Sequence, residues 1–320
     1  MVARSPRKGK SKFKVKNWSE YNRSLVHRGR IDFWIDESAI AQWHPEIETP
    51  KRGGQIGYSD ISIQSCLIMR QLYRLPLRQT EGFVTSLIDM ANLKIQCPDY
   101  TTISKRTSGL KSFYEKLKKI DRDKPITILV DSTGVKTYGE GEWKQEKHGE
   151  GKPTKWLKFH LGVNEENLEI EASILSDCHT SDVSQVIPLL EQIEEEIQDV
   201  KADGAYDYDS LVDSLKSFGI KGEGVFSPRI HFLSEDWKTN PTQRDLHLLR
   251  IAIDGRDVWE YASGYSKRNL VENAMFRYKN AFGTRLKSRN QKNQEVETEF
   301  RVHLLNQMTR LGMPKSERIR

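Results

Sequence analysis

The chain has 320 residues, with 51 Lys and Arg against 45 Asp and Glu, a formal net charge of +6 and a sequence pI of about 9.0. A hydrophobic content of 36% and a charged content of 30% describe a polar but globular protein, long enough for two domains. The sequence contains no run of about 18 apolar residues, so we expect no membrane span. The N-terminus also lacks an apolar signal core, so we expect a cytosolic protein. The basic balance points to a polyanionic partner, nucleic acid above all.

Residues 1–16 carry seven Lys and Arg and no acidic residue. This composition predicts a disordered tail, in which Arg4, Arg7 and Lys8 are suited to contacts with DNA phosphates. A solvated tail without a binding role would have the same composition, so the tail by itself does not decide between the two.

Residues 17–120 have a helical pattern, and we expect an all-α domain there. Asp36 and Ser59 are placed to cap helices, and Thr101 or Thr102 to cap a later one. Short helices joined by short turns are compatible with a helix-turn-helix DNA-binding domain, in which Lys105 and Arg106 would contact DNA. A helical packing domain with a charged surface is the alternative.

From residue 121 to 314 the pattern predicts a mixed α/β layer fold. An apolar run at 125–131 indicates a buried central strand ending in Asp131, and alternating residues at 155–163 and 168–176 complete an antiparallel meander. After these three strands, helices alternate with short strands, and one of the short strands ends in a turn at Asp203. Residues 230–262 show no clear period and are expected to form an irregular insertion, and residues 315–320 a tail.

Three carboxylates, Asp131, Asp203 and Glu272, are far apart in the sequence, but the fold could bring them together at the carboxyl ends of central strands. Three carboxylates at one place repel one another unless a cation neutralises them, and Mg²⁺ prefers oxygen ligands. Two such ions can activate a water and stabilise a leaving oxygen at phosphorus. Each carboxylate also has an ordinary interpretation, as a turn former or a surface residue.

The stretch "SGYSKRNLVENAMFRYKNAFG" at 263–283 predicts an amphipathic helix. Arg268, Glu272 and Lys279 lie on one stripe, opposite an apolar face formed by Val271, Met275, Tyr278 and Phe282. One carboxylate between two cations could be no more than a set of surface ion pairs.

Several segments in order make the chain resemble bacterial insertion-sequence transposases of the DDE type, in the group typified by insertion sequence five. They include "DSTGVKTYGEGEWKQEKHG", "KWLKFHLGV", "ADGAYD" and the stretch at 263–283. In this last stretch Tyr265, Arg268, Glu272 and Lys279 match the Tyr-Arg-Glu-Lys signature of that group position for position. The resemblance runs from about residue 17 to 314.

The resemblance implies a catalytic core like ribonuclease H, in which Asp131, Asp203 and Glu272 hold two Mg²⁺ ions, with Mn²⁺ as a possible substitute. It implies that Arg268 and Lys279 hold DNA phosphates and that Tyr265 orients the DNA backbone. The implied function is a transposase that binds terminal inverted repeats, hydrolyses phosphodiester bonds and transfers the 3′-hydroxyl ends into target double-stranded DNA. Paired-end synapsis implies at least a homodimer on DNA.

A Gly-rich loop and the strand after it offer further DNA contacts. The predicted contacts are Lys144, Lys147, His148, Lys158 and His160, and a solvated hairpin with an outward-facing strand is the alternative. Two other functions stay open: a structure-specific nuclease of the same fold, and a catalytically idle DNA-binding protein descended from a transposase.

Overall fold

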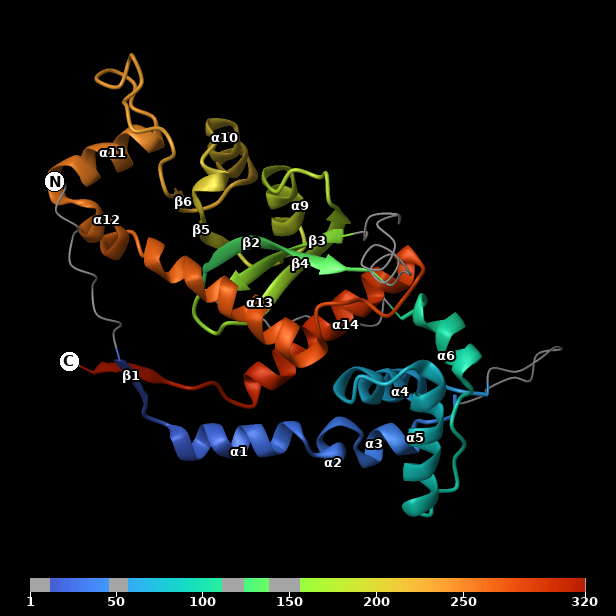
Figure 1. Ribbon diagram of the computed structural model, residues 1–320. Coiled ribbons are helices and arrows are strands. Elements are labelled where there is room, and N and C mark those ends of the chain that lie inside the picture. Colours follow the sequence, from blue (N-terminus) through green and yellow to red (C-terminus); the bar gives the residue numbers. More distant parts are fainter. Residues whose placement is uncertain (1–11, 46–56, 111–123, 138–155, 320) are drawn as a thin grey trace, which may run out of the picture.

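A central sheet of five strands organises the chain. The computed structural model describes residues 12–45, 57–110, 124–137 and 156–319 (Figure 1). Hydrogen bonds join the strands in the order β4-β3-β2-β5-β6. Their bounds are β2 Ile126–Lys136, β3 Trp156–Asn164, β4 Ile170–Asp177, β5 Ile197–Ala202 and β6 Gly224–Phe226. No helix in the described ranges is both long and apolar enough to cross a membrane.

The strand directions confirm the predicted fold class. β2, β3 and β4 pair antiparallel as a meander, whereas β5 runs parallel to β2 and β6 runs parallel to β5. This is the mixed sheet of a ribonuclease H-like fold. β2 is longer than predicted, because its pairing with β3 continues past Asp131 as far as Lys136.

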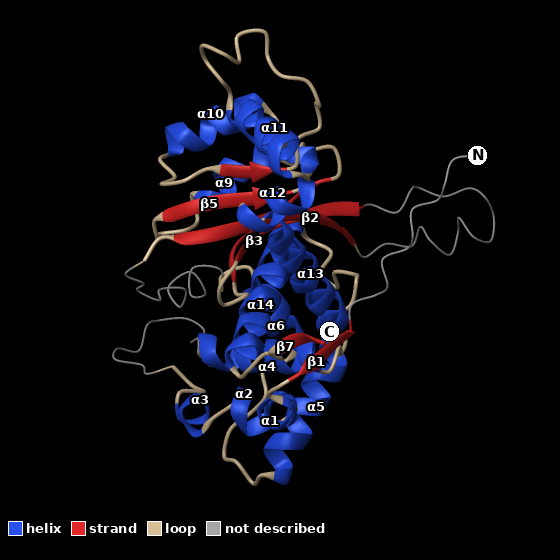
Figure 2. Cartoon of the chain, turned by 90° about the vertical axis from the view of Figure 1, so that its left-hand side faces the viewer, coloured by secondary structure: helices blue, strands red, loops and turns tan. Residues whose placement is uncertain are grey.

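Helices cover both faces of this sheet (Figure 2). On one side α9 (Val186–Leu190) and α10 (Asp209–Phe218) enclose a core that includes Ile128 and Val130. On the other side α13 (Asn269–Phe282) and α14 (Gln291–Arg310) pack on Leu129 and Val135. Neighbouring residues of β2 therefore face different layers, as the twofold period of a strand requires.

An N-terminal group of helices lies beyond α13 and α14, away from the sheet (Figures 1 and 2). Their bounds are α1 Trp18–Arg28, α2 Ile31–Trp34, α3 Glu37–Ala41, α4 Asp60–Leu72, α5 Leu77–Met90 and α6 Tyr100–Thr107. The buried apolar residues of α2, α4, α5 and α6 form one continuous core with α13, α14 and the sheet. The described part of the helical region therefore packs directly on the layer formed by α13 and α14.

Side chains at the N-terminal ends of α3, α4 and α6 cap these helices by accepting nearby backbone N–H groups. Asp36 and Ser59 accept backbone N–H groups of α3 and α4, as predicted. The cap of α6 is Asp99, which accepts the N–H groups of Thr101 and Thr102, so the prediction of a threonine cap was wrong by two or three residues. An aspartate at this position binds two backbone donors as well as both threonine hydroxyls.

The two ends of the described chain pair with each other. Within the segment predicted as a basic tail, Lys12–Val15 form β1, which pairs antiparallel with β7 (Ser316–Ile319). Asn17 continues this contact, because its side chain donates to the carbonyl of Met313 at 3.0 Å and accepts from the N–H of Lys315 at 2.7 Å. A strand pair thus fastens the start of α1 to the segment that follows α14.

The segment expected to be irregular contains two helices, α11 (Gln243–Asp254) and α12 (Arg256–Ala262), which extend from one end of the molecule (Figure 1). A capping box starts α11: the Thr242 hydroxyl accepts from the N–H of Asp245, and the Asp245 carboxylate accepts from the N–H of Thr242. This Thr-x-x-Asp pattern was readable in the sequence and predicts a helix start.

Candidate active site

The pairing of β2 with β5 sets two of the predicted carboxylates side by side. The last parallel pair joins Leu129 to Lys201. Continued by two residues, this register brings Asp131 level with Asp203, which directly follows the last residue of β5. Asp203 follows the end of β5 in an extended conformation, and its carboxylate accepts the N–H of Ala205 at 2.7 Å. The two residues are thus placed at the same point of the sheet, 72 positions apart in sequence.

Both carboxylates belong to the face that α13 covers. Asp131 shares its face of β2 with Leu129, which packs in the core beneath α13. Asp203 shares its face with Lys201, whereas Val200 and Ala202 point into the opposite core. Side chains of α13 that point toward the sheet therefore lie on the same face as these two carboxylates.

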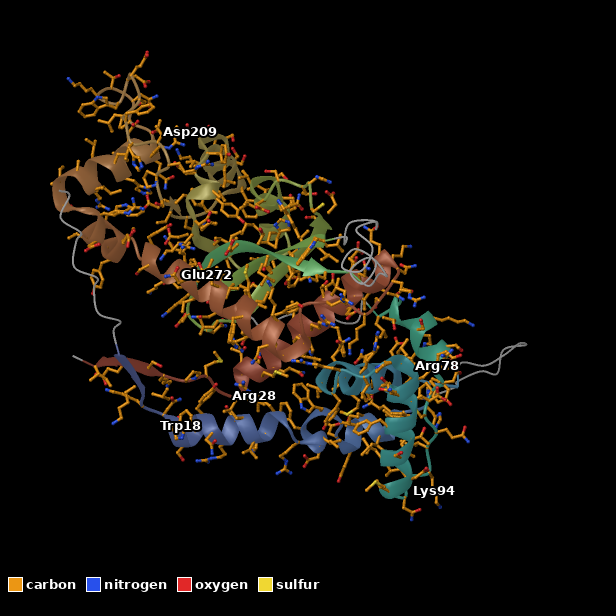
Figure 3. The ribbon with its side chains drawn as sticks, in the orientation of Figure 1. Trp18, Arg28, Arg78, Lys94, Asp209 and Glu272 are labelled. Atoms are coloured by element: carbon orange, nitrogen blue, oxygen red, sulfur yellow. The ribbon has the colours of Figure 1, made fainter. Side chains whose placement is uncertain are left out.

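Glu272 is in the first turn of α13, next to the sheet (Figure 3). Val271, Met275, Tyr278 and Phe282 are buried, which confirms the predicted apolar face of this helix. The Glu272 carboxylate accepts a hydrogen bond from Arg268 at 3.0 Å. Its side chain is 55% exposed, so it has room to change rotamer.

The electrostatics of Asp131 show that the three acidic groups influence one another. Burial, together with weaker repulsion by the carboxylates of Asp203 and Glu272, raises the pKa of Asp131 to about 6. The N–H of Ser132 and the guanidinium of Arg268 act in the opposite direction without cancelling the rise. The fold therefore leaves negative charge at this edge of the sheet incompletely neutralised.

The other signature residues surround this edge. Lys279 donates a hydrogen bond at 2.5 Å to Thr133, two residues after Asp131 on β2. Tyr265 is buried, with its ring centroid 5.2 Å from that of Trp259. The guanidinium carbon of Arg268 lies 5.7 Å from the centre of the Tyr265 ring. Trp259 is thus a packing residue beneath the signature.

A residue that the sequence analysis did not single out holds the turn that carries the signature. Glu165, in the turn between β3 and β4, accepts from Lys201 at 2.7 Å and from Lys267 at 2.6 Å. Burial raises the pKa of Glu165, but these two ammonium groups outweigh it, so the pKa is lowered overall. Gly264, with φ at +66°, lies against Lys201: a Cβ there would be 2.6 Å from the ammonium nitrogen. No short-range signal in the sequence marks Glu165.

The donor set at the sheet edge suits a hard divalent cation. Carboxylate oxygens are the preferred ligands of Mg²⁺. A cation bound here would favour the ionised form of Asp131, whose pKa is raised by burial and by the carboxylates of Asp203 and Glu272. Among the described residues, no group of three or more His, Cys, Asp or Glu side chains is already arranged as a metal site. To join Asp131 and Asp203 as a ligand, Glu272 would have to turn away from Arg268.

The predicted DNA contacts differ in their surroundings. Lys105 is exposed on α6, but Arg106 binds the carbonyl of Tyr58 and the carboxylate of Asp60, joining α6 to the start of α4. These bonds give Arg106 a structural role whether or not it contacts DNA.

The two predicted contacts on β3 lie on the face that packs against α9. Lys158 donates to the carbonyl of Thr180 at 2.8 Å and lies 3.2 Å from Asp182. His160 is 1% exposed and hydrogen-bonds to Ser176 at 2.8 Å, and burial lowers its pKa. Its ring lies below the surface, because its side of β3 packs inward. The remaining predicted contacts, Arg4, Arg7, Lys8, Lys144, Lys147 and His148, are outside the described residues.

Two family models, both described as "Transposase DDE domain", match residues 26–140 and residues 122–307. A solved structure, the cryo-EM structure of the piggyBac transposase synaptic complex with hairpin DNA, is similar at 9% identity and a TM-score of 0.31. That similarity covers 94% of this chain and 84% of the other, and at so low a TM-score it carries no weight here. The second family match spans more than half of the chain and includes all three carboxylates. The chain belongs to the DDE transposase family.

Proposed function

We propose that this transposase binds the terminal inverted repeats of an insertion sequence, cuts the DNA at the element ends and joins the freed ends to target DNA. The observation that carries the proposal is the shared position of Asp131, Asp203 and Glu272. Three distant segments bring their carboxylates to one face of the sheet, close enough for two of them to raise the pKa of the third. The narrower resemblance to the group typified by insertion sequence five stays a prediction.

The reaction consists of two phosphoryl transfers without a covalent enzyme intermediate. In the first, water attacks a phosphodiester at the element end, the bond from phosphorus to the 3′-oxygen breaks, and a 3′-hydroxyl is freed. In the second, this hydroxyl attacks a phosphodiester of the target, forming one new bond and releasing a target 3′-hydroxyl. When bound by the three carboxylates, a pair of Mg²⁺ ions, or Mn²⁺ in their place, supplies activation of the attacking oxygen and stabilisation of the leaving one.

The chain's own groups position the DNA for these steps. With a pKa of about 6, Asp131 is ionised at neutral pH and available as a ligand. Arg268, once released by Glu272, and Lys279, which donates to Thr133, hold phosphates, and their charge offsets the negative charge of the transition state. Tyr265 orients the DNA backbone from its packed position beside Arg268.

The N-terminal helices supply the site that reads the element end. The exposed Lys105 on α6 is the described residue that we assign to DNA contact there. Two copies of the chain, each bound to one end, form the synaptic homodimer. The protein acts in the bacterial cytoplasm, on the DNA of the nucleoid.

A cleavage-and-joining assay tests the proposal. Purified protein, labelled DNA from the inverted repeats of the native element, a target plasmid and Mg²⁺ should give both nicked ends and joined products. Asp131→Ala and Glu272→Ala should abolish both reactions, whereas Asp213→Ala, which changes an exposed carboxylate on α10, should leave them intact. Cleavage without joining identifies a nuclease, and binding without cleavage identifies an idle DNA-binding protein. Unchanged cleavage by the first two variants would refute the site.

A further inference from the structure

Arg74 has a backbone conformation that its residue type disfavours. It follows α4 with φ at +54°, in the left-handed region. Its N–H donates to the carbonyl of Gln71 at 3.3 Å, and the N–H of Leu75 donates to that of Arg70 at 3.0 Å. This arrangement ends many helices, and glycine or asparagine is the usual residue at the left-handed position.

The end of α5 provides an internal comparison. Asn92 has φ at +52°, its N–H donates to the carbonyl of Asp89 at 3.0 Å, and the N–H of Leu93 donates to that of Ile88 at 3.1 Å. The backbone pattern is the same as at Arg74, but the residue is the expected asparagine and its side chain is exposed. An arginine in the same strained conformation therefore calls for a reason outside its own helix.

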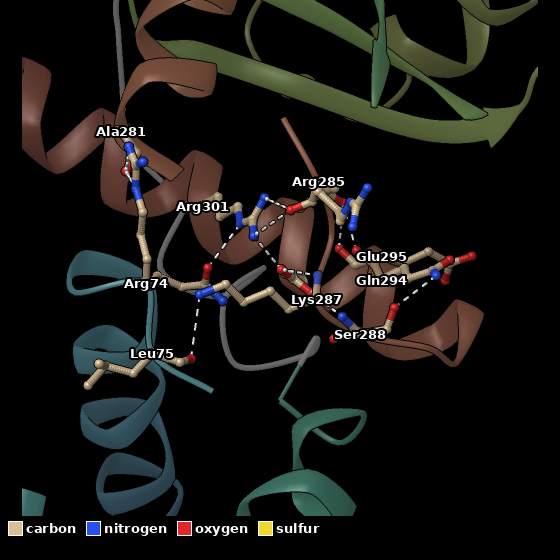
Figure 4. Close-up of polar contacts among 12 residues, drawn as sticks. Arg74, Leu75, Ala281, Arg285, Lys287, Ser288, Gln294, Glu295 and Arg301 are labelled. Carbon is tan, nitrogen blue, oxygen red and sulfur yellow. Dashed lines mark hydrogen bonds and ion pairs between the residues drawn. The ribbon is translucent and has the colours of Figure 1, made fainter. Parts of the chain in front are cut away.

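The side chain of Arg74 supplies that reason. Its Nε and Nη2 both lie 3.2 Å from the carbonyl oxygen of Ala281, and Nη2 also donates to the carbonyl of Asn280 (Figure 4). These carbonyls belong to the last turn of α13, where backbone acceptors lack partners within the helix and a cation is favourable. The strained arginine thus joins the N-terminal helices to the end of the signature helix.

Two further polar links accompany this contact. Arg301 on α14 donates to the side chain of Gln71 on α4 at 3.0 Å, and Lys287 reaches the carbonyl of Leu75 at 3.5 Å (Figure 4). The end of α4 is therefore fastened to α13, to α14 and to the segment between them. Arg74 is the member of this set that grips α13 itself.

The last turn of α13 also carries Lys279, one residue before the carbonyl of Asn280. Its ammonium group donates to Thr133 on β2, two residues beyond Asp131. A displacement of this turn would change the position of Lys279 relative to the sheet. The contact of Arg74 is thus connected to the candidate active site through one turn of helix and one side chain.

We propose that Arg74 is a positioning residue for the reaction: it holds the last turn of α13 against α4, so that Lys279 stays aligned with β2. It needs no contact with DNA or with the reacting atoms. The effect on catalysis rests on the proposed transposase function, whereas the mechanical link between α4 and α13 does not.

The variant Arg74→Gly separates this role from general stabilisation. Glycine relieves the left-handed backbone while it removes the side chain, so the melting temperature should change by no more than about 2 °C. Hydrogen exchange of the Phe282 and Gly283 amides, in the last turn, should become about tenfold faster. The rate of strand cleavage at saturating DNA should fall about tenfold with unchanged DNA affinity.

Two controls make the test specific. Asn92→Gly changes the matched position on α5 and should alter neither exchange in α13 nor cleavage. If Arg74 acts through Lys279, adding Arg74→Gly to Lys279→Met should cause little further loss of cleavage, because the two effects are not additive. Fully additive losses would overturn the proposed route.

The exchange measurement separates a failure of this proposal from a failure of the proposed function. Unchanged exchange at Phe282 and Gly283 in Arg74→Gly refutes the link, whatever the activity. Faster exchange with an unchanged cleavage rate refutes the positioning role. Should Arg74→Gly fail to fold, Arg74→Lys replaces it: it keeps the charge but loses the paired donors, and the same exchange and cleavage criteria apply. If the wild-type protein cuts no DNA, the transposase proposal fails, while the exchange data still decide the link.

Discussion

Two regions of this chain place carboxylates in poorly hydrated surroundings, and the groups respond in opposite ways. Glu297 on α14 is only 3% exposed. Burial raises its pKa, but Arg301 and Arg70 outweigh that effect, helped by backbone N–H donors of Lys287 and Ser288, so the pKa is lowered overall. This carboxylate has all the partners it needs within the protein.

Asp131 is less buried, yet its pKa is raised to about 6. Its neighbours include two further carboxylates and one guanidinium, that of Arg268. The comparison teaches that burial alone does not distinguish a structural acid from a functional one. What distinguishes them is whether the fold supplies the compensating charge or leaves that charge to a ligand.

The largest effect should come from neutralising the uncompensated acid. Asp131→Asn should slow cleavage by at least about 10³-fold, which corresponds to about 4 kcal/mol of transition-state stabilisation. The same change removes a charge that is costly to bury and that two neighbouring carboxylates repel, so the free energy of unfolding without metal should rise by about 1–2 kcal/mol. Single-turnover cleavage and urea unfolding measure the two quantities. If Asp131→Asn lowered both stability and activity, Asp131 would be a structural acid like Glu297.

Glu297→Gln should have the opposite character. It leaves Arg301 and Arg70 buried without their counter-charge, so unfolding should require about 3 kcal/mol less. Folded molecules should still cut DNA at close to the normal rate. Glu317→Gln, which breaks an exposed ion pair with Lys16, serves as the control and should cost less than about 1 kcal/mol in urea unfolding. A cost for Glu297→Gln no greater than this would contradict the contrast.

Added Mg²⁺ should stabilise the protein through the acidic edge. At a concentration of about 100 times the dissociation constant, the gain is about 2.7 kcal/mol, seen as a higher melting temperature near neutral pH. Near pH 5 the gain should shrink, because Asp131 is then protonated for most of the time. Asp131→Asn should abolish most of the gain, and an equal gain in this variant would show that the ion binds elsewhere.

The two acids should give opposite pH dependences of stability. Between pH 3.8, the usual pKa, and about 6, folded Asp131 holds a proton that the unfolded chain has lost, so stability falls as pH rises. The lowered pKa of Glu297 gives stability that is present above its usual value of 4.5 and is lost as pH falls. Urea unfolding across this range should show the first slope flattened in Asp131→Asn, by about 1–2 kcal/mol after allowance for solvent screening. The acid-side loss should weaken in Glu297→Gln, and identical profiles for all three proteins would refute both assignments.

The smallest effect concerns the turn before Arg268. Gly264→Ala forces a side chain into the left-handed region and toward Lys201, which Glu165 holds in place, so we expect a loss of about 1 kcal/mol. Cleavage should fall severalfold as Arg268 shifts. Gly82→Ala, inside α5 with open space around it, should instead stabilise by about 0.5–1 kcal/mol. Thermal unfolding of both variants measures the difference. If Gly264→Ala left the stability unchanged, the backbone at this position would not require glycine.

The sequence predicted those parts of the structure that short-range patterns control. The antiparallel meander, the apolar face of α13 and the caps at Asp36 and Ser59 follow from alternation, helical period and single side-chain acceptors. The start of α11 was equally readable from Thr242 and Asp245, although this segment has no clear apolar period.

The residues alone could not predict which distant segments of the chain lie side by side. Nothing local brings Asp131 beside Asp203, because that depends on the parallel register of β2 with β5. The resemblance to a transposase supplied this pairing in advance. Glu165 and Arg74 lacked any such guide, since their partners are 36 and about 200 positions away. His160 was assigned to the DNA side because alternation along β3 identifies two faces but not which of them another layer will cover.

The pairing of β1 with β7 has a practical consequence for handling this protein. Trimming the chain before Ser316 would remove the strand that pairs with Lys12–Val15, and ending it before Gly312 would also remove the carbonyl that Arg28 binds at 2.7 Å. Both changes would loosen α1 although every carboxylate of the site is left untouched. A purification tag or a shortened end at either terminus should therefore be compared with the unmodified chain before any loss of DNA cutting is ascribed to the catalytic groups.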